Sequence, residues 1–359
     1  MQGRLMGKRL TGRHFYDWLK RRLALARIAG GGYEISSVDT GYSDCQLCAD
    51  LNSLHLLPWS EGAVLAISNP HSASQKRWKN LNNHQYMNHQ QYSTHHQYMN
   101  ISASSAIEPF MRSVRNKLEE AADPLTMADR HIIAKHGIRD KAEQSGMIAS
   151  FMAKFSSTAF GNACHIHMSL QDVETGKNAF YDQNDEYGMS TLARNWIAGL
   201  LKYVPEAAYF FAPYINSYKR LQPHTFAPTK CCWAIDNRTS AFRLCNSKSA
   251  GINVELRIGG ADLNPYLAFS AIIAAGISGI EEKLELPSPA SGNLYNDKEL
   301  PEFPNSLQKA THLLRESKML NKTFGEKVIL HYVNAANVEI NEFSKQVTDW
   351  ELNQGFNRY

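Results

Sequence analysis

The chain has 359 residues, enough for two or three domains, and 43% of them are hydrophobic, which is ordinary for a globular protein. The net charge of +4 is small for this length and does not indicate a general nucleic-acid binder, and no apolar run is long enough to cross a membrane. The apolar stretch at residues 23–30 contains Arg27 and is too short for a signal peptide, so we expect a cytoplasmic protein without nucleic-acid or membrane partners.

Residues 1–70 are expected to form a small mixed domain. Strands are predicted near residues 2–5, 35–38 and 63–68, and a helix is predicted over residues 12–28. The helix is predicted because Phe15, Trp18, Leu19 and Leu23 fall near helical spacing.

A low-complexity tract occupies residues 71–105. The pentapeptide HQYMN occurs at residues 84–88 and again at residues 96–100, and the tract is rich in His, Gln, Asn, Tyr and Ser. Such a composition buries too little apolar surface to become ordered, so we expect a disordered insert. A metal-binding histidine tract is the alternative that the composition leaves open.

Six cysteines are present, and Cys45 and Cys48 are spaced as C-x-x-C. A structural zinc site of this kind needs a second pair of ligands, and the sequence has no second C-x-x-C. We therefore expect all six thiols to be reduced.

After two predicted helices at residues 107–122 and 125–145, a segment of β character carries two histidines. His165 and His167 are spaced as H-x-H, so both imidazoles are expected on one side of the strand. There they could share a metal ion or a phosphate. A pair of structural histidines is the alternative, since a closed metal site needs further ligands.

Residues 254–258 are predicted to form a strand on which Glu255 and Arg257 share one face, because side chains two apart on a strand point the same way. Arg220, Arg238 and Arg243 precede this strand. Several converging guanidinium groups suit a phosphate or carboxylate ligand. The alternative is that these arginines are solvated surface charges.

The C-terminal third is predicted to be mostly helical. Asn264 followed by Pro265 is typical of a helix N-terminus, and the nearly continuous apolar run at residues 266–280 indicates a buried helix. A surface loop is expected at residues 284–304, followed by helices at residues 306–319, 321–336 and 337–350.

The motifs MADRH, FMAK, GNACHIHMSL, NSYKRL, FAPT, DNRTSAFR, VELR and GADLNPYLA occur in an order that resembles the glutamine synthetase superfamily. The tail VTDWELNQGFNRY, together with TFAPT, is most similar to the gamma-glutamylpolyamine synthetase branch. The resemblance covers residues 123–359 almost continuously, with a weaker block at residues 2–70.

The resemblance implies an α+β fold. It implies a shortened β-grasp domain at residues 1–70 and, after the insert at residues 71–105, a catalytic domain at residues 106–359 with a curved antiparallel sheet and helices. It also implies a homo-oligomeric ring of ten or twelve subunits, with active sites between neighbours.

The resemblance further implies a ligase that uses ATP and Mg²⁺ or Mn²⁺ to phosphorylate the γ-carboxylate of glutamate, after which an amine displaces phosphate. The positions matching family catalytic residues are Arg238, Arg243 and Asp44. Those matching nucleotide-binding residues are His167, Ser169, Arg238 and Arg243. Those matching glutamate-site residues are Gly161, Arg220 and Arg257. Those matching metal ligands are His165 and Glu255.

The sequence departs from the family at its metal ligands. An E-L-E-type strand and a G-Q-x-E strand carry most of the family's metal-binding glutamates, and neither motif occurs here. Glu119, Glu120 and Asp123 lie near the second gap as candidate substitutes. With one matched ligand per ion, we expect impaired catalysis. The alternatives are a non-catalytic binding or structural subunit, alone or assembled with an intact paralogue, and the product of a damaged coding sequence.

Phe226 is the position that indicates the amine. Where ammonia-using members carry a glutamate in a G-Y-E-A-P-like turn, this chain has His224, Thr225 and Phe226 before Ala-Pro. An aromatic ring suits the carbon chain or cationic end of a larger amine. We therefore expect a polyamine or another primary amine rather than ammonia.

Overall fold

The computed structural model describes residues 120–358 without a break, and before them five short strands and positions 114 and 118. The strands are β1 (Ala24–Leu25), β2 (Cys45–Ala49), β3 (His55–Leu56), β4 (Val64–Leu65) and β5 (Ser68–Ser72). β2 pairs antiparallel with both β1 and β5, and β3 pairs antiparallel with β4.

These strands test part of the predicted N-terminal domain. β4 and the first residue of β5 fall within the strand predicted at residues 63–68. The helix predicted over residues 12–28 is wrong at Ala24 and Leu25, whose backbone pairs with Gln46 and Cys45. Pairing with a distant strand overrides a local helical pattern. The other predictions for residues 1–113 lie outside the described residues, apart from residues 71–72, which belong to β5.

The chain divides into two compact units. One comprises Met1–Arg4, Ala121–Ile132 and Ser150–Tyr359, and the other comprises Leu5–Glu120 and Ile133–Ala149. Helix α3 (Pro124–Gln144) runs from the first unit into the second, and the Asp123 carboxylate caps it by accepting bonds from Leu125 N and Thr126 N. The predicted domain boundaries at residues 70 and 105 stay a prediction.

A four-stranded open sheet organises the first unit. Its strands are β6 (Ile166–Met168), β7 (Trp233–Ile235), β8 (Phe242–Cys245) and β9 (Asn253–Leu256), in the order β6-β9-β8-β7. β9 runs antiparallel to both neighbours, whereas β7 and β8 are parallel. The α+β class is therefore confirmed, but the sheet is mixed and not wholly antiparallel, because a crossing loop returns the chain to the starting end of β7.

Helices α4 (Thr191–Tyr203) and α7 (Pro265–Glu281) pack closely against each other. Their contact requires glycine: a Cβ on Gly199 would lie 2.8 Å from the Cα of Gly279. The predicted cap of α7 is confirmed, since the Asn264 side chain accepts a bond from Tyr266 N at 3.0 Å and Pro265 is the first helical residue. The two helices and the sheet share one apolar core.

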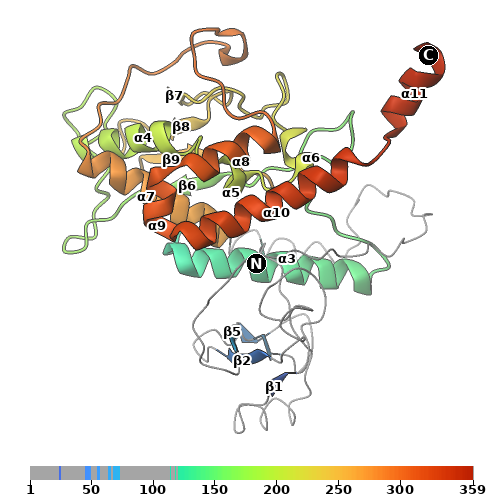
Figure 1. Ribbon diagram of the computed structural model, residues 1–359. Helices are drawn as coiled ribbons and strands as arrows, with labels where there is room; N and C mark the ends of the chain where they lie inside the picture. Colours follow the sequence, from blue (N-terminus) through green and yellow to red (C-terminus); the bar gives the residue numbers. More distant parts are fainter. Residues whose placement is uncertain are drawn as a thin grey trace. The chain divides into compact units, whose positions relative to one another are not determined.

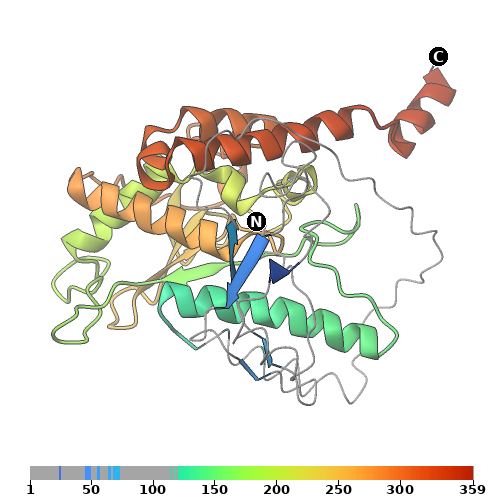
Figure 2. The same cartoon turned by 60° about the horizontal axis from the view of Figure 1, so that its bottom comes forward.

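The remaining described elements are all helical. They are α5 (Ala208–Phe211), α6 (Ile215–Tyr218), the 3₁₀ turn η2 (Leu294–Asn296), α8 (Leu307–Glu316), α9 (Lys318–Phe324), α10 (Glu326–Ser344) and α11 (Asp349–Arg358). α8 and α10 lie side by side, and α11 stands clear of the other helices (Figures 1 and 2). No helix among the described residues combines the length and the apolarity that crossing a membrane requires.

The predicted helix break between residues 336 and 337 is wrong, because α10 runs through it. Ala336 is fully buried, and α10 packs along α8, so tertiary contacts continue the helix past Asn337. The break occurs earlier, at Gly325, whose φ of 84° a helix cannot accommodate.

Candidate active site

Three polar side chains form a row across the sheet, one from each of three strands. His167 on β6 lies opposite Glu255 on β9, and Glu255 lies opposite Arg243 on β8. Directly opposed residues of an antiparallel pair project to the same face. The neighbours of Glu255 on its own strand, Val254 and Leu256, are buried in the core. One face of the sheet is thus apolar and the other is charged.

The carboxylate of Glu255 is the centre of the charged face, and the residue is only 3% exposed. Its Oε1 lies 2.8 Å from Nη1 of Arg257 and 3.0 Å from Nδ1 of His165, and its Oε2 lies 2.8 Å from Nη1 of Arg243. Burial by itself would raise the pKa of Glu255, but hydrogen bonds from His165 and Arg243 and the charge of Arg257 hold that pKa well below its ordinary value. The group is ionised at neutral pH. The predicted common face for Glu255 and Arg257 is confirmed.

Both histidines of the H-x-H pair approach this carboxylate, which confirms that they face one way. Nδ1 of His165 lies 3.0 Å and Nε2 of His167 lies 3.8 Å from Glu255 Oε1. Burial lowers the pKa of His165, and although the hydrogen bond with Glu255 opposes this, the net shift is downward. His165 is therefore neutral at pH 7. His167 is more exposed, and its Nδ1 lies 2.9 Å from Oδ1 of Asn253.

Two arginines are fixed around Glu255, and a third is exposed nearby. Arg243 pairs with Asp236 as well as with Glu255, its Nε donating to Asp236 Oδ1 at 2.9 Å. Arg257 donates from Nε to Arg238 O and from Nη2 to Phe226 O, both at 3.1 Å. The Arg238 side chain is exposed and has no ion pair with any described residue. This face thus combines anchored cations with one that can turn toward a ligand.

Gly161 and Arg220 pack against each other. Arg220 is 3% exposed, and its Nη2 donates to the carbonyl oxygens of Ile258 and Gly259, the latter at 3.0 Å. Burial lowers the pKa of Arg220 to about 10, which leaves it charged at pH 7. A Cβ on Gly161 would lie 2.7 Å from Ala153 O and closer still to the Arg220 side chain. Because the Arg220 guanidinium donates its hydrogen bonds to backbone carbonyl oxygens, a glutamate-binding role for Arg220 stays a prediction.

The other predicted positions are less tied to the cluster. Phe226 lies at the edge of the cluster: the residue is 60% exposed, and its backbone oxygen accepts a hydrogen bond from Arg257. Ser169 is exposed just after β6. Asp44 lies outside the described residues. The structure therefore brings together His165, His167, Glu255, Arg243 and Arg257 as one contact group.

The described residues do not form a site for a divalent cation. Among them, no group of three or more His, Cys, Asp and Glu side chains could hold a metal ion. Both oxygens of Glu255 are engaged by Arg243, Arg257 and His165, so a cation there would lie against two guanidinium groups. The predicted metal roles of His165 and Glu255 remain untested, and within residues 120–358 they lack partner carboxylates.

The sequence analysis did not predict several residues that contact the predicted site residues. Asp236 pairs with Arg243, Asn253 contacts His167, and Tyr295 donates to Ala227 O at 3.1 Å. Phe160 packs on Phe226 with ring centroids 5.8 Å apart. Asp236 and Asn253 carried local signals, because Asp236 lies two residues before Arg238 in the DNRTSAFR motif and Asn253 lies two residues before Glu255 on the same strand. The other contacts join segments that are distant in sequence.

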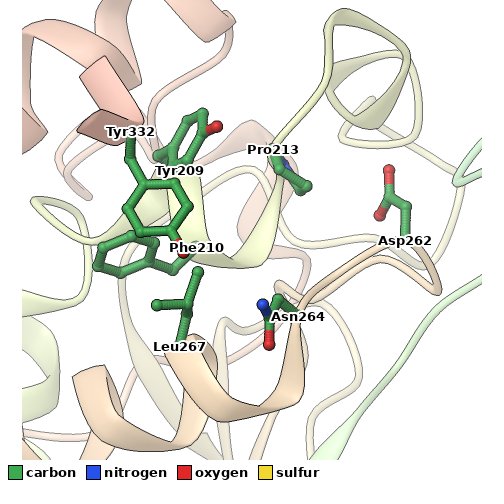
Figure 3. A pocket seen from close by; sticks show the side chains of 7 residues that line it. All are labelled: Tyr209, Phe210, Pro213, Asp262, Asn264, Leu267 and Tyr332. Atoms are coloured by element: carbon green, nitrogen blue, oxygen red, sulfur yellow. The ribbon is translucent and has the colours of Figure 1, made fainter. Parts of the chain in front are cut away.

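A separate small pocket lies between α5, α7 and α10 (Figure 3). Its lining residues are Tyr209, Phe210, Pro213, Asp262, Asn264, Leu267 and Tyr332. None of them is a predicted site residue, and most are aromatic or apolar residues that belong to the core or adjoin it. We therefore place the candidate site at the charged face of the sheet.

Comparison with known proteins shows which family shares this architecture. Residues 120–355 match the family model "Glutamine synthetase, catalytic domain". The gamma-glutamylethanolamide synthetase GlnA4 of Streptomyces coelicolor is 34% identical over an alignment that covers 100% of this chain and 91% of that protein. That alignment has 427 positions against the 359 residues of this chain, so GlnA4 has segments without a counterpart here.

Two further matches agree. The glutamate–isopropylamine ligase of a Pseudomonas species is 30% identical over an alignment that covers 89% of this chain and 83% of that protein. A solved structure of a GmaS/ADP complex superposes with a TM-score of 0.72 at 20% identity, covering 96% of this chain and 92% of that one. At that identity the likeness shows a shared fold.

Proposed function

Because the chain belongs to the glutamine synthetase family, we propose that it is an ATP-dependent ligase that joins the γ-carboxylate of glutamate to a primary amine. Two similar proteins, from Streptomyces coelicolor and a Pseudomonas species, bear the names of amine ligases, which supports a carbon-bearing amine rather than ammonia. The observation that carries the proposal is the pair of arginines anchored on both oxygens of the buried Glu255.

The proposed reaction has two steps. The γ-carboxylate of glutamate attacks the terminal phosphorus of ATP, so that an O–P bond forms and ADP leaves. The amine nitrogen then attacks the carbonyl carbon of γ-glutamyl phosphate. A C–N bond forms, the C–O bond to phosphate breaks, and the nitrogen gives one proton to water. Negative charge gathers on phosphoryl oxygens in both steps, where fixed cations lower the barrier.

The arginines suit this charge pattern in different ways. Arg243 is held from two sides by Asp236 and Glu255, so its remaining donors can meet a phosphate without reorganisation. Arg238 is exposed and suits the outer phosphates. Arg257 is buried and donates to Glu255 and to two backbone oxygens, so in this proposal it positions Glu255 and the loop of Phe226, while its direct contact with the substrate glutamate stays a prediction.

Glu255 acts in this proposal as the counter-ion that keeps the arginines in place. Without it, two guanidinium groups on one sheet face would repel each other. The residues described here do not suit a divalent cation, so no step is assigned to Mg²⁺ or Mn²⁺. The loss of the family's glutamate-bearing strands from the sequence supports a slow enzyme.

The test is ADP release by the purified protein with glutamate and ATP, with and without Mg²⁺ or Mn²⁺. The amines are ammonia, ethanolamine, putrescine and spermidine, and mass spectrometry identifies the γ-glutamylamide. Arg243→Gln should lower kcat/KM by about 100-fold or more, whereas Arg315→Gln, an exposed arginine on α8, should stay within about 2-fold. A folded wild-type protein that releases no ADP with any amine would overturn the proposal and leave a non-catalytic binding subunit.

The assembly is implied by the family and the cytoplasmic location by the sequence analysis, and both stay predictions. We propose a homo-oligomer, with a mixed assembly with an intact paralogue as the alternative, and a cytoplasmic location. Light scattering of the purified chain, alone and mixed with a paralogue, tests the homo-oligomer and the mixed assembly. A mass of ten or twelve subunits supports the ring.

A further inference from the structure

Phe160 stands at the end of a loop whose base is fixed. Asn162 N donates to Ala153 O and Asn162 Nδ2 donates to Met152 O, both at 2.8 Å. Within the loop, Nζ of Lys154 donates to Ala159 O, directly before Phe160. The following residue, Gly161, packs on the buried Arg220. The backbone on both sides of Phe160 is therefore tied down, although its side chain is 64% exposed.

Phe226 stands on a second loop that is also held in place. His224 and Phe226 have positive φ values of 63° and 57°, a conformation that residues other than glycine adopt only when the surroundings impose it. Arg257 binds Phe226 O, and the hydroxyl of Tyr295 binds the next carbonyl oxygen, each at 3.1 Å. Thr225 Oγ1 donates to Arg220 O at 3.1 Å. The same arginine that pairs with Glu255 thus fixes Phe226 beside the charged face.

The two rings meet although both remain open to solvent. Their centroids are 5.8 Å apart with an interplanar angle of 52°, an ordinary geometry for an aromatic pair. Phe160 is 64% and Phe226 is 60% exposed, so the pair leaves most of its apolar surface in water. Core packing does not require such an arrangement. An exposed aromatic pair suits a ligand with an apolar part that covers the rings and a cationic end that lies over a ring face.

We infer that Phe160 is a specificity-determining residue that, together with Phe226, holds the carbon chain of the amine substrate. The substrate class is a primary amine with a chain of two or more carbons, whose nitrogen lies toward Arg257 and Glu255. This inference rests on the proposed ligase function. It assigns to Phe160 a role that the sequence did not indicate.

The experiment compares Phe160→Ala, Phe160→Leu and Phe226→Ala with Phe356→Ala, a control that removes a still more exposed ring on α11. ADP release is measured with butylamine and with ammonia. Phe160→Ala and Phe226→Ala should each lower kcat/KM for butylamine by about 10-fold or more, because the loss of even one methylene contact in an apolar substrate pocket costs about 10-fold. Values for ammonia should change less than about 2-fold, Phe160→Leu should keep most of the activity, and Phe356→Ala should match wild type.

A second readout separates this inference from the ligase proposal. Butylamine is titrated calorimetrically into wild type and Phe160→Ala in the presence of glutamate and a non-hydrolysable ATP analogue. Tighter binding by wild type supports the inference even if no ADP is released. Equal binding, no binding by either protein, or equal losses of kcat/KM for ammonia and butylamine would overturn it. Matching circular dichroism spectra and unfolding midpoints show that the variants are folded.

Discussion

Replacing Glu255 by Gln tests the central electrostatic claim. The substitution keeps the side-chain shape but removes the charge that lies 2.8 Å from Arg257 and 2.8 Å from Arg243. Arg257 is 3% exposed, so water cannot take over the role of the carboxylate. Breaking one side of a buried ion pair costs about 3–5 kcal/mol. Gln still accepts one hydrogen bond, so we expect a loss of about 3 kcal/mol in the free energy of unfolding.

The assay is urea unfolding followed by circular dichroism, at pH 7 and constant ionic strength. Glu342→Gln is the matched control, because it removes the same charge from an exposed pair with Lys345 at 2.8 Å. Exposed pairs contribute little, so its effect should stay below about 1 kcal/mol. Adding Arg257→Gln to Glu255→Gln should cost less than the sum of the single losses. Equal effects of Glu255→Gln and Glu342→Gln would refute the view that Glu255 holds the cluster together.

Three further predictions concern other parts of the described structure. Gly199→Ala should destabilise the protein by about 1–3 kcal/mol or more, because the new methyl group would clash with α7. Gly251→Ala is the control: no atom lies within 3.4 Å of the added Cβ, so this variant should unfold like wild type. Burial raises the pKa of Cys231 to about 12, so its thiol should resist iodoacetamide at pH 8 in the native protein and react in urea. Peptide mass mapping measures the labelling of this thiol. Fast labelling of the native protein would contradict the burial of Cys231. Tyr266→Phe removes a 2.5 Å bond to Asp129 and should lower the unfolding free energy by about 1.5–3 kcal/mol; an unchanged urea midpoint would exclude this contribution.

Local sequence patterns predicted those features that local chemistry decides. The start of α7 at Asn264 and Pro265 was predictable because capping involves neighbouring residues only. The shared face of Glu255 and Arg257, and that of His165 and His167, followed from the two-residue period of a strand.

The unpredicted features depend on contacts between distant segments. The Arg220 side chain donates to carbonyl oxygens 38 and 39 residues away, so its spacing in the sequence did not reveal its burial. Phe160 and Phe226 come from separate loops, and no periodicity relates them. The continuous α10 was missed because packing against α8, rather than helix propensity, extends it past Asn337.

The row of side chains across β6, β9 and β8 also has a consequence for the folding kinetics of the protein. His167 and its partner Asn253 are 86 residues apart, so the row cannot form until a long loop has closed and β9 has inserted between its two neighbours. Contacts of such high sequence separation form slowly compared with helices. During refolding, helical circular dichroism should therefore recover before the proposed binding of a phosphate-bearing ligand does.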